Sequence, residues 1–184
     1  MTSKGVHKRV DGSDNYSTPL CAYEMLVPFV REVATRIGKT KGLTIYDPFY
    51  HDGSAKPYIE KAFAEFEPIV LHEPKWVDLD GVPTEEMLRA DIIITNPPYT
   101  RGLKQKSTEF VLRAGKPVAT LLPVDWLTTK GLRNVDGGDR AQIIVPSGRF
   151  KFEVGGESKT KTAPNGSLWF CYGFELERDM YILS

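Results

Sequence analysis

The chain has 184 residues, of which 41% are hydrophobic, and its 24 basic side chains balance 24 acidic ones. This length suits one globular domain with a substantial core, and a net charge of zero excludes an overall field that draws the chain to nucleic acid. Cys21 and Cys171 lie far apart without metal-ligand spacing, and no stretch is apolar and long enough for a signal peptide or a membrane span. We therefore expect a soluble intracellular protein without a metal site or a membrane partner.

The N-terminal part predicts an arm followed by a helix. Residues 1–15 are polar and basic, which is typical of a flexible arm. The next stretch, "YSTPLCAYEMLVPFVREVATRIG", repeats apolar residues near the helical period. Ser17 or Thr18 would be the N-cap, and Gly38 would end the helix. Pro28 should kink this helix or split it in two.

Strands and helices alternate through the rest of the chain. We expect strands at 42–48, 68–74, 90–99 and 116–127, and helices at 54–66, 83–89 and 105–115. The unbroken run of isoleucines at 92–94 suits a parallel strand that is covered on both faces. This order predicts a doubly wound α/β sheet, which 141–152 and 166–177 would close as a strand and an edge hairpin. Residues 153–166, rich in Gly, Lys and Thr, predict a loop.

Three predicted strands end in distinctive residues, at the edge of the sheet where ligands bind in such folds. The first ends in "DPFYHDGS", the second in "HEP" and the third in "NPPY". Gly53 and its small neighbour allow a backbone to approach a ligand closely. Glu73 stands where an acid commonly holds a nucleotide ribose through its hydroxyls, although an exposed carboxylate would look the same. Together the three segments favour a nucleotide-like cofactor.

These segments resemble the S-adenosylmethionine-dependent amino-methyltransferases, which methylate exocyclic nitrogens of adenine or cytosine. "DPF" with its turn is similar to the first-strand signature of that family, "NPPY" to its catalytic signature, and "STP" at 17–19 to its N-terminal cofactor segment. "PSGRFKF" and "APNGSLWF" resemble the late strand pair of small phage-type DNA adenine methyltransferases. The resemblance covers about residues 16–175. The first turn departs from it, because residues 50–53 contain fewer glycines than the family usually shows.

The resemblance implies a fold and a domain organisation. The fold would be a Rossmann-like class I methyltransferase: a mostly parallel seven-stranded-type sheet with helices on both faces and a late antiparallel strand pair. Residues 16–184 would form a single methyltransferase domain without a separate target-recognition domain. Target selectivity would then be slight, or it would come from loops or from a partner subunit.

The resemblance also implies roles for the matching residues. Asn96, through its side-chain oxygen, and Pro97, through its carbonyl, would accept the two amino hydrogens of the substrate. Pro98 would help to fix that carbonyl, and Tyr99 would stack on a flipped base. The cofactor would be S-adenosyl-L-methionine. Its expected contacts are Ser17, Thr18, Asp47, Pro48, Phe49, Asp52, Gly53, Glu73 and Asp78.

Clusters of positive charge offer candidate contacts to nucleic acid. Arg101, Lys104 and Lys106 directly follow the tetrapeptide, and Arg149 and Lys151 precede the predicted loop. Lysine and arginine at such positions commonly bind phosphates. A solvated basic face would have the same pattern, so both interpretations stay open.

Three functions are compatible with these residues. The first is methyl transfer to N6 of adenine in DNA. The second uses the same site on adenine in RNA or on a protein glutamine, whose planar amide nitrogen is an equally poor nucleophile. The third is a catalytically degenerate fold that binds nucleic acid or a partner, which the sparse glycines of the first turn motivate. The residues leave the oligomeric state and a cellular or viral origin open.

Overall fold

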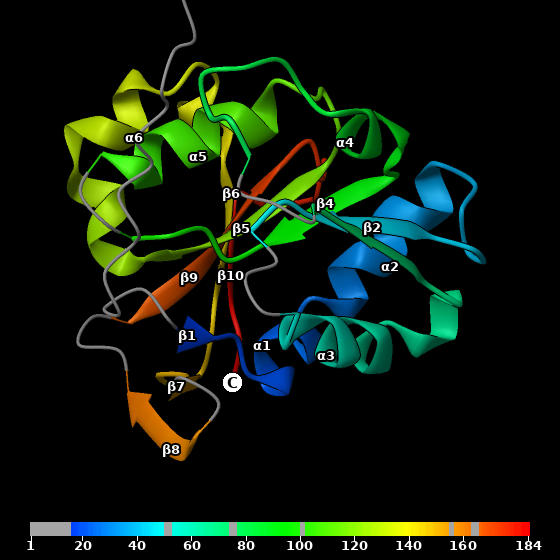
Figure 1. Cartoon of the computed structure of the whole chain (residues 1–184). Helices are drawn as coiled ribbons and strands as arrows, with labels where there is room; N and C mark the ends of the chain where they lie inside the picture. The colour runs from blue at the N-terminus through cyan, green and yellow to red at the C-terminus, as the bar shows by residue number, and fades with distance from the viewer. Residues whose placement is uncertain (1–15, 50–52, 74–76, 100–101, 155–156, 163–165) are drawn as a thin grey trace, which may run out of the picture.

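The computed structural model describes residues 16–49, 53–73, 77–99, 102–154, 157–162 and 166–184, so the predicted arm at 1–15 lies outside the described part. A sheet of seven strands crosses the molecule in the order β10-β6-β9-β5-β4-β2-β3 (Figure 1). Its strands are β2 (Thr44–Asp47), β3 (Ile69–His72), β4 (Ile92–Thr95), β5 (Val118–Pro123), β6 (Gln142–Val145), β9 (Ser167–Tyr172) and β10 (Met180–Ile182). Neighbours are parallel except β9, which is antiparallel to β5 and β6.

Helices cover both faces of this sheet, as the sequence predicts (Figure 1). One face carries α1 (Leu20–Glu24), α2 (Val27–Arg36) and α3 (Ala55–Ala62), and the other carries α4 (Glu85–Arg89), α5 (Leu103–Leu112) and α6 (Lys130–Asn134). Short 3₁₀ helices are η2 (Ala64–Phe66), η3 (Val124–Thr128) and η4 (Gly138–Arg140). In β4, Ile92 and Ile94 join the core on the α1 side and Ile93 joins the core on the α5 side. The isoleucine run is therefore buried on both faces, as expected.

The position of β9 corrects one expectation. Residues 166–177 do not form an edge hairpin, because β9 lies between β5 and β6 and all six of its residues are buried. A continuous apolar strand needs cover on both faces, and the helices on the two sides of the sheet supply it for β9. The edge on this side is instead β10, where Met180 and Ile182 are exposed.

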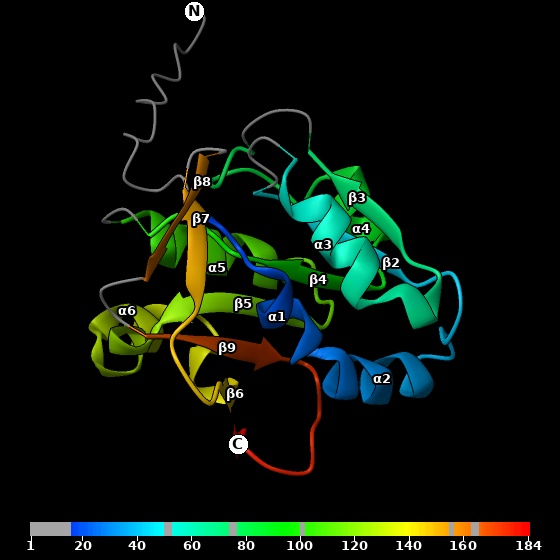
Figure 2. The same ribbon diagram turned by 90° about the horizontal axis from the view of Figure 1, so that it is seen from below.

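A second, three-stranded sheet corrects the predicted loop. It contains β1 (Tyr16–Ser17), β7 (Lys151–Val154) and β8 (Glu157–Thr162) in the order β1-β7-β8, and all its pairs are antiparallel. Part of the segment 153–166 is therefore strand rather than loop. Its threonines are β-branched and favour an extended backbone. Figures 1 and 2 show that β1 leads directly into α1, so the small sheet anchors the start of the domain.

The N-terminal helix is split, as Pro28 predicts. α1 ends before α2 begins, and Pro28 occupies the first turn of α2, where its missing N–H costs little. The predicted N-cap is wrong, since Pro19 takes that position and no side chain caps the helix. Ser17 belongs to β1 instead, and its backbone pairs with Glu153. Thr18 is buried between the strand and the helix.

Two further observations concern the described residues. No helix among them combines the length and the apolar character that crossing a membrane requires. No group of three or more His, Cys, Asp or Glu side chains in the described ranges is arranged to hold a metal ion.

Candidate active site

The order of the sheet reverses at β2. This strand pairs with β3 on one side and with β4 on the other, so the chain crosses from one half of the sheet to the other here. In open α/β sheets, ligands bind beside the carboxyl ends of the strands at such a point. Asp47 ends β2, Thr95 ends β4, and Asn96 follows directly. We call residues 47–49 and 95–99 the switch-point rim.

A short hydrogen bond joins the two halves of this rim. The Thr95 hydroxyl donates to Oδ1 of Asp47 at 2.6 Å, and the Phe49 amide donates to the same oxygen at 3.0 Å. Both partners are buried, since Thr95 is 0% and Asp47 is 3% exposed. Burial raises the pKa of Asp47 to about 6, and the hydrogen bonds from Thr95 and Phe49 oppose that rise. The carboxylate thus ionises near neutral pH.

Asn96 provides an acceptor that has no hydrogen-bond partner among the described residues. The residue is half-buried, and the following Pro97 and Pro98 are buried. Its side-chain oxygen Oδ1 is buried and accepts no hydrogen bond from any described residue. Leaving such an oxygen without water or a donor costs about 1–3 kcal/mol, which is why most buried carbonyl oxygens are paired. The rim therefore presents a desolvated acceptor to a donor from outside this part of the chain.

Tyr99 is fixed against the neighbouring strand. Its hydroxyl donates to the carbonyl oxygen of Leu121 in β5 at 3.0 Å, and its half-buried ring packs on the core of the α5 side. The two prolines before it restrict the backbone at the same place. The orientation of the ring is therefore set by the fold.

The N-terminal segment meets the turn after β2. Oγ of Ser17 and Oγ of Ser54 lie 2.7 Å apart and share a hydrogen bond. Gly53, next to Ser54, has a φ of 84°, a conformation that other residues adopt only with strain. The structure thus brings Ser17 and Gly53, both predicted cofactor contacts, to one place. Asp52, another predicted contact, lies outside the described residues.

Glu73 is oriented by a tyrosine from β2. The Tyr46 hydroxyl donates to Oε1 of Glu73 at 2.8 Å and lies 3.1 Å from Oγ1 of Thr84. Burial raises the pKa of Tyr46 well above its ordinary value, so its hydroxyl stays protonated. β2 and β3 pair in register with Asp47 opposite His72, and Glu73 follows one residue later. Two carboxylates therefore stand at adjacent strand ends.

Comparisons with known proteins place this geometry among known folds. A scan against protein-family models and a search of curated proteins found no match. Among solved structures the chain is similar to the type I restriction-modification system methyltransferase subunit from Streptococcus thermophilus, with a TM-score of 0.57 and 13% identity over 91% of this chain and 47% of that one. The chain has a Rossmann-like methyltransferase fold. It spans about half the length of that subunit.

A weaker likeness is to a precorrin-6y C5,15-methyltransferase from Geobacter metallireducens GS-15. It has 12% identity and a TM-score of 0.34, and it covers 76% of this chain and 85% of that one. A likeness at this level supports no conclusion about the methyltransferase fold of the present chain.

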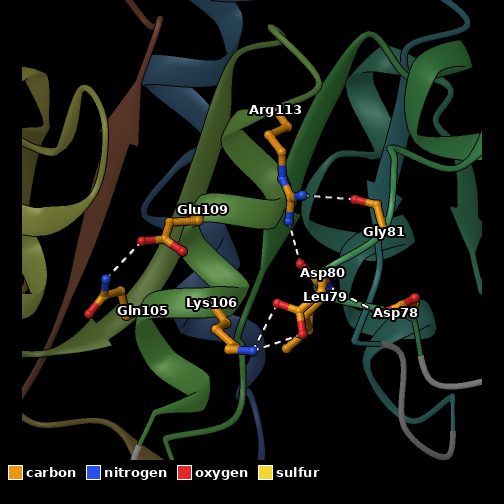
Figure 3. A network of polar contacts seen from close by, with 8 residues as sticks. All are labelled: Asp78, Leu79, Asp80, Gly81, Gln105, Lys106, Glu109 and Arg113. Carbon is orange, nitrogen blue, oxygen red and sulfur yellow. Dashed lines mark hydrogen bonds and ion pairs between the residues drawn. The ribbon is translucent and has the colours of Figure 1, made fainter. Parts of the chain in front are cut away.

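Asp78 lies in a loop that α5 holds in place (Figure 3). Oδ1 of Asp78 accepts the backbone N–H of Asp80 at 3.1 Å, and its side chain is exposed. Lys106 of α5 binds both carboxylate oxygens of Asp80 at 2.8 Å and lowers the pKa of that group. Arg113, near the end of α5, donates to the carbonyl oxygens of Gly81 at 2.8 Å and of Leu79. We call Asp78–Gly81 with Lys106 and Arg113 the loop–helix network.

The predicted phosphate contacts do not form one cluster of unpaired charges. Lys106 pairs with Asp80, as above, and Lys104 lies 3.8 Å from Asp125 and 5.5 Å from the centre of the Trp126 ring. Arg149 and Lys151 are exposed and belong to the segment around β7 instead. Arg101 lies outside the described residues. A role in binding phosphate stays a prediction for this set.

Sequence reasoning missed three residues of the site. Thr95 binds Asp47 and Tyr46 binds Glu73, as described above, while Tyr23 of α1 is fully buried beside Asp47. Burial, with the charge of Asp47 as a second cause, raises the pKa of Tyr23. Only Thr95 had a usable signal, a polar residue that ends an otherwise isoleucine strand immediately before the tetrapeptide.

Proposed function

We propose that this chain transfers a methyl group from S-adenosyl-L-methionine to an exocyclic amino nitrogen, and that the substrate is N6 of adenine in DNA. The observation that carries the proposal is the desolvated, unpaired oxygen of Asn96 at the switch point of a methyltransferase fold. An acceptor in that position suits a substrate that brings its own N–H donor. The amino group of adenine is such a donor.

The residues at the strand ends fit this cofactor, which supplies an electrophilic methyl group on a positively charged sulfur. Asp47 is buried, and its hydrogen bonds from the described residues come from a hydroxyl and a backbone amide rather than from a cation. A buried carboxylate without a cationic partner favours a positively charged ligand. Glu73, held by Tyr46, would bind the ribose hydroxyls, and Asp78 would bind the adenine amino group of the cofactor.

Other predicted contacts would hold the remaining groups of the cofactor. Ser17 stands beside the turn at Gly53 through its hydrogen bond with Ser54, and Thr18 follows it in the chain. Pro48 and Phe49 continue the chain from Asp47, and the Phe49 amide already fixes that carboxylate. We include all four residues in the proposed cofactor site, with Asp52 as the predicted contact outside the described part.

The catalytic task is to make a delocalised nitrogen nucleophilic. Asn96 Oδ1 would accept one amino hydrogen and the Pro97 carbonyl oxygen the other, which draws the lone pair out of conjugation with the ring. Positive charge then develops on the nitrogen, and two fixed acceptors stabilise it. Burial of Asn96 Oδ1 strengthens this interaction because little water screens it. After the nitrogen has taken the methyl group, one amino hydrogen would leave as a proton to solvent water, so no dedicated general base is needed.

Tyr99 would hold the target base beside these acceptors. Its hydroxyl is tied to Leu121, so the ring does not need to reorient when a base arrives. An enzyme that modifies a base inside a duplex must first take it out of the stack, and an aromatic ring commonly receives it. The name of the similar structure, a restriction-modification methyltransferase subunit, supports DNA as the substrate. Loops or a partner subunit would supply target selectivity.

The test is transfer of a labelled methyl group to DNA, RNA and protein by the purified chain. We expect labelled N6-methyladenine in DNA, and Asn96→Ala should lower the rate by about 100-fold or more, as loss of one preorganised hydrogen-bonding group does. Asn134→Ala is the matched control, because Asn134 is exposed on α6. If the label appears only in RNA or only in glutamine, the substrate is not DNA, although the reaction at the amino nitrogen remains as proposed. Equal rates for wild type and Asn96→Ala would contradict the mechanism.

A further inference from the structure

The hydrogen bond between Thr95 and Asp47 connects two parts of the proposed site. Asp47 ends the strand that carries the first cofactor segment, and Thr95 precedes the acceptor Asn96 on the adjacent strand. The bond is short, at 2.6 Å, and it is buried. An O–H···O⁻ bond of this length is typical of a charged acceptor. The resemblance to known enzymes assigns no role to Thr95.

The surroundings of Asp47 leave few other groups to hold its charge. Tyr23 of α1 and Tyr46 of β2 are titratable side chains whose pKa the charge of Asp47 helps to raise. Burial raises the pKa of both phenols, so they remain neutral near pH 7. The Thr95 hydroxyl and the Phe49 amide therefore provide the favourable hydrogen bonds to the ionised form.

We propose that Thr95 is a positioning residue, whose hydroxyl holds Asp47 ionised and oriented for the cofactor and ties its strand to the strand of Asn96. The inference rests on the proposed function, since it requires Asp47 to contact the cofactor. It assigns the hydroxyl an electrostatic task, whereas a merely structural role would be limited to filling the core. The two roles predict different dependence on pH.

The neighbouring strand offers a matched control. Thr120 of β5 lies directly opposite Thr95 in the register of β4 and β5, and it is equally buried, at 0% exposed. Its hydroxyl has no hydrogen-bond partner among the described residues. Thr120→Val therefore removes a buried threonine hydroxyl beside the site without removing a bond to Asp47.

The experiment measures binding of S-adenosyl-L-homocysteine by calorimetry between pH 5 and 9, for wild type, Thr95→Val, Thr95→Ser and Thr120→Val. Loss of the donor raises the pKa of Asp47, so the pH of half-maximal affinity in Thr95→Val should rise by about one unit. Affinity at pH 5 should fall about tenfold, affinity at pH 7 should fall about twofold, and affinity at pH 9 should match wild type. Thr95→Ser and Thr120→Val should stay within about twofold of wild type.

Several outcomes overturn the proposal, and they separate it from the proposed function. If wild type binds no S-adenosyl-L-homocysteine, both fail together. If wild type binds it and the midpoint of Thr95→Val does not move, the role of Thr95 alone fails. A loss that is equal at every pH, or that Thr120→Val reproduces, also contradicts it. Should Thr95→Val not fold, Thr95→Ala carries the same predicted shift, and carboxyl NMR of Asp47 reads the pKa directly.

Discussion

The switch-point rim and the loop–helix network differ in how their polar groups are paired and exposed. In the rim, the described residues provide no cation for the buried Asp47 and no donor for the buried oxygen of Asn96. In the network, Lys106 neutralises Asp80 at an exposed position and Arg113 satisfies two backbone carbonyls (Figure 3). Unsatisfied burial costs stability, and paired exposure costs little. Under the proposed function, the rim would bind the ligand and the network would hold in place the loop that carries Asp78.

The largest effect on cofactor binding is expected at Asp47. Asp47→Asn keeps the acceptor oxygen for Thr95 and Phe49 but removes the charge, so affinity for S-adenosyl-L-homocysteine at pH 8 should fall by roughly 100-fold. If the protein with the neutral side chain binds the ligand as tightly as wild type, the charge of Asp47 has no role in cofactor binding. Calorimetry of the two proteins under identical conditions measures this.

The same substitution should stabilise the unbound protein. The pKa of Asp47 is raised from an ordinary 3.8 to about 6 by burial, so its ionisation lowers stability above pH 6 and has no effect below pH 4. Asp47→Asn should therefore raise the free energy of unfolding at pH 8 by about 1–3 kcal/mol, and the gain should vanish at pH 4. Urea denaturation at both pH values checks the sign. A loss of stability at pH 8 would show that the carboxylate is not strained in the fold.

Tyr99→Phe should have an intermediate effect. It removes the hydrogen bond to Leu121 and leaves the aromatic ring, so the stacking surface remains while its orientation loosens. We expect methyl transfer to slow by roughly 3–10-fold and stability to fall by about 0.5–1.5 kcal/mol. Steady-state rates with an adenine-containing oligonucleotide and a denaturation curve give both values. An unchanged rate would show that the Tyr99 hydroxyl does not help to orient the ring for the target base.

The smallest effect should come from the exposed pair in the network. Lys106→Met and Asp80→Asn break an ion pair at the surface, where solvent already screens both charges. We expect no measurable change in melting temperature and a change in methyl-transfer rate within about twofold. Affinity for DNA at low salt should be measured as well, because a phosphate contact by Lys106 would be strongest there. A marked loss of DNA affinity with Lys106→Met alone would support Lys106 as a phosphate contact.

The sequence predicted those parts of the molecule that depend on local pattern. The isoleucine run of β4 and the alternation of strands and helices follow from periodicity, and Pro28 splits the first helix because of its own geometry. The tetrapeptide at 96–99, which we propose to be catalytic, was recognisable because its residues are adjacent in the chain. Each of these signals lies within one short segment.

The features that the sequence did not predict depend on pairing between distant segments. β9 has the composition of a buried strand, but its place between β5 and β6 is decided by which strands are still unpaired. Thr95 and Asp47 are 48 positions apart, and their contact exists only because β2 and β4 are neighbours. The sequence did not reveal the ion pair of Lys106, because its partner Asp80 lies 26 positions earlier in the chain. Contacts of this kind require the sheet order, which periodicity does not contain.

The most direct test of the account is the single-turnover rate of Asn96→Ala at saturating S-adenosyl-L-methionine and DNA. If the unpaired oxygen serves the amino group, the rate falls about 100- to 1,000-fold, while affinity for S-adenosyl-L-homocysteine stays within about twofold of wild type. A rate equal to that of wild type, or a loss explained entirely by weaker cofactor binding, would contradict the role given to Asn96.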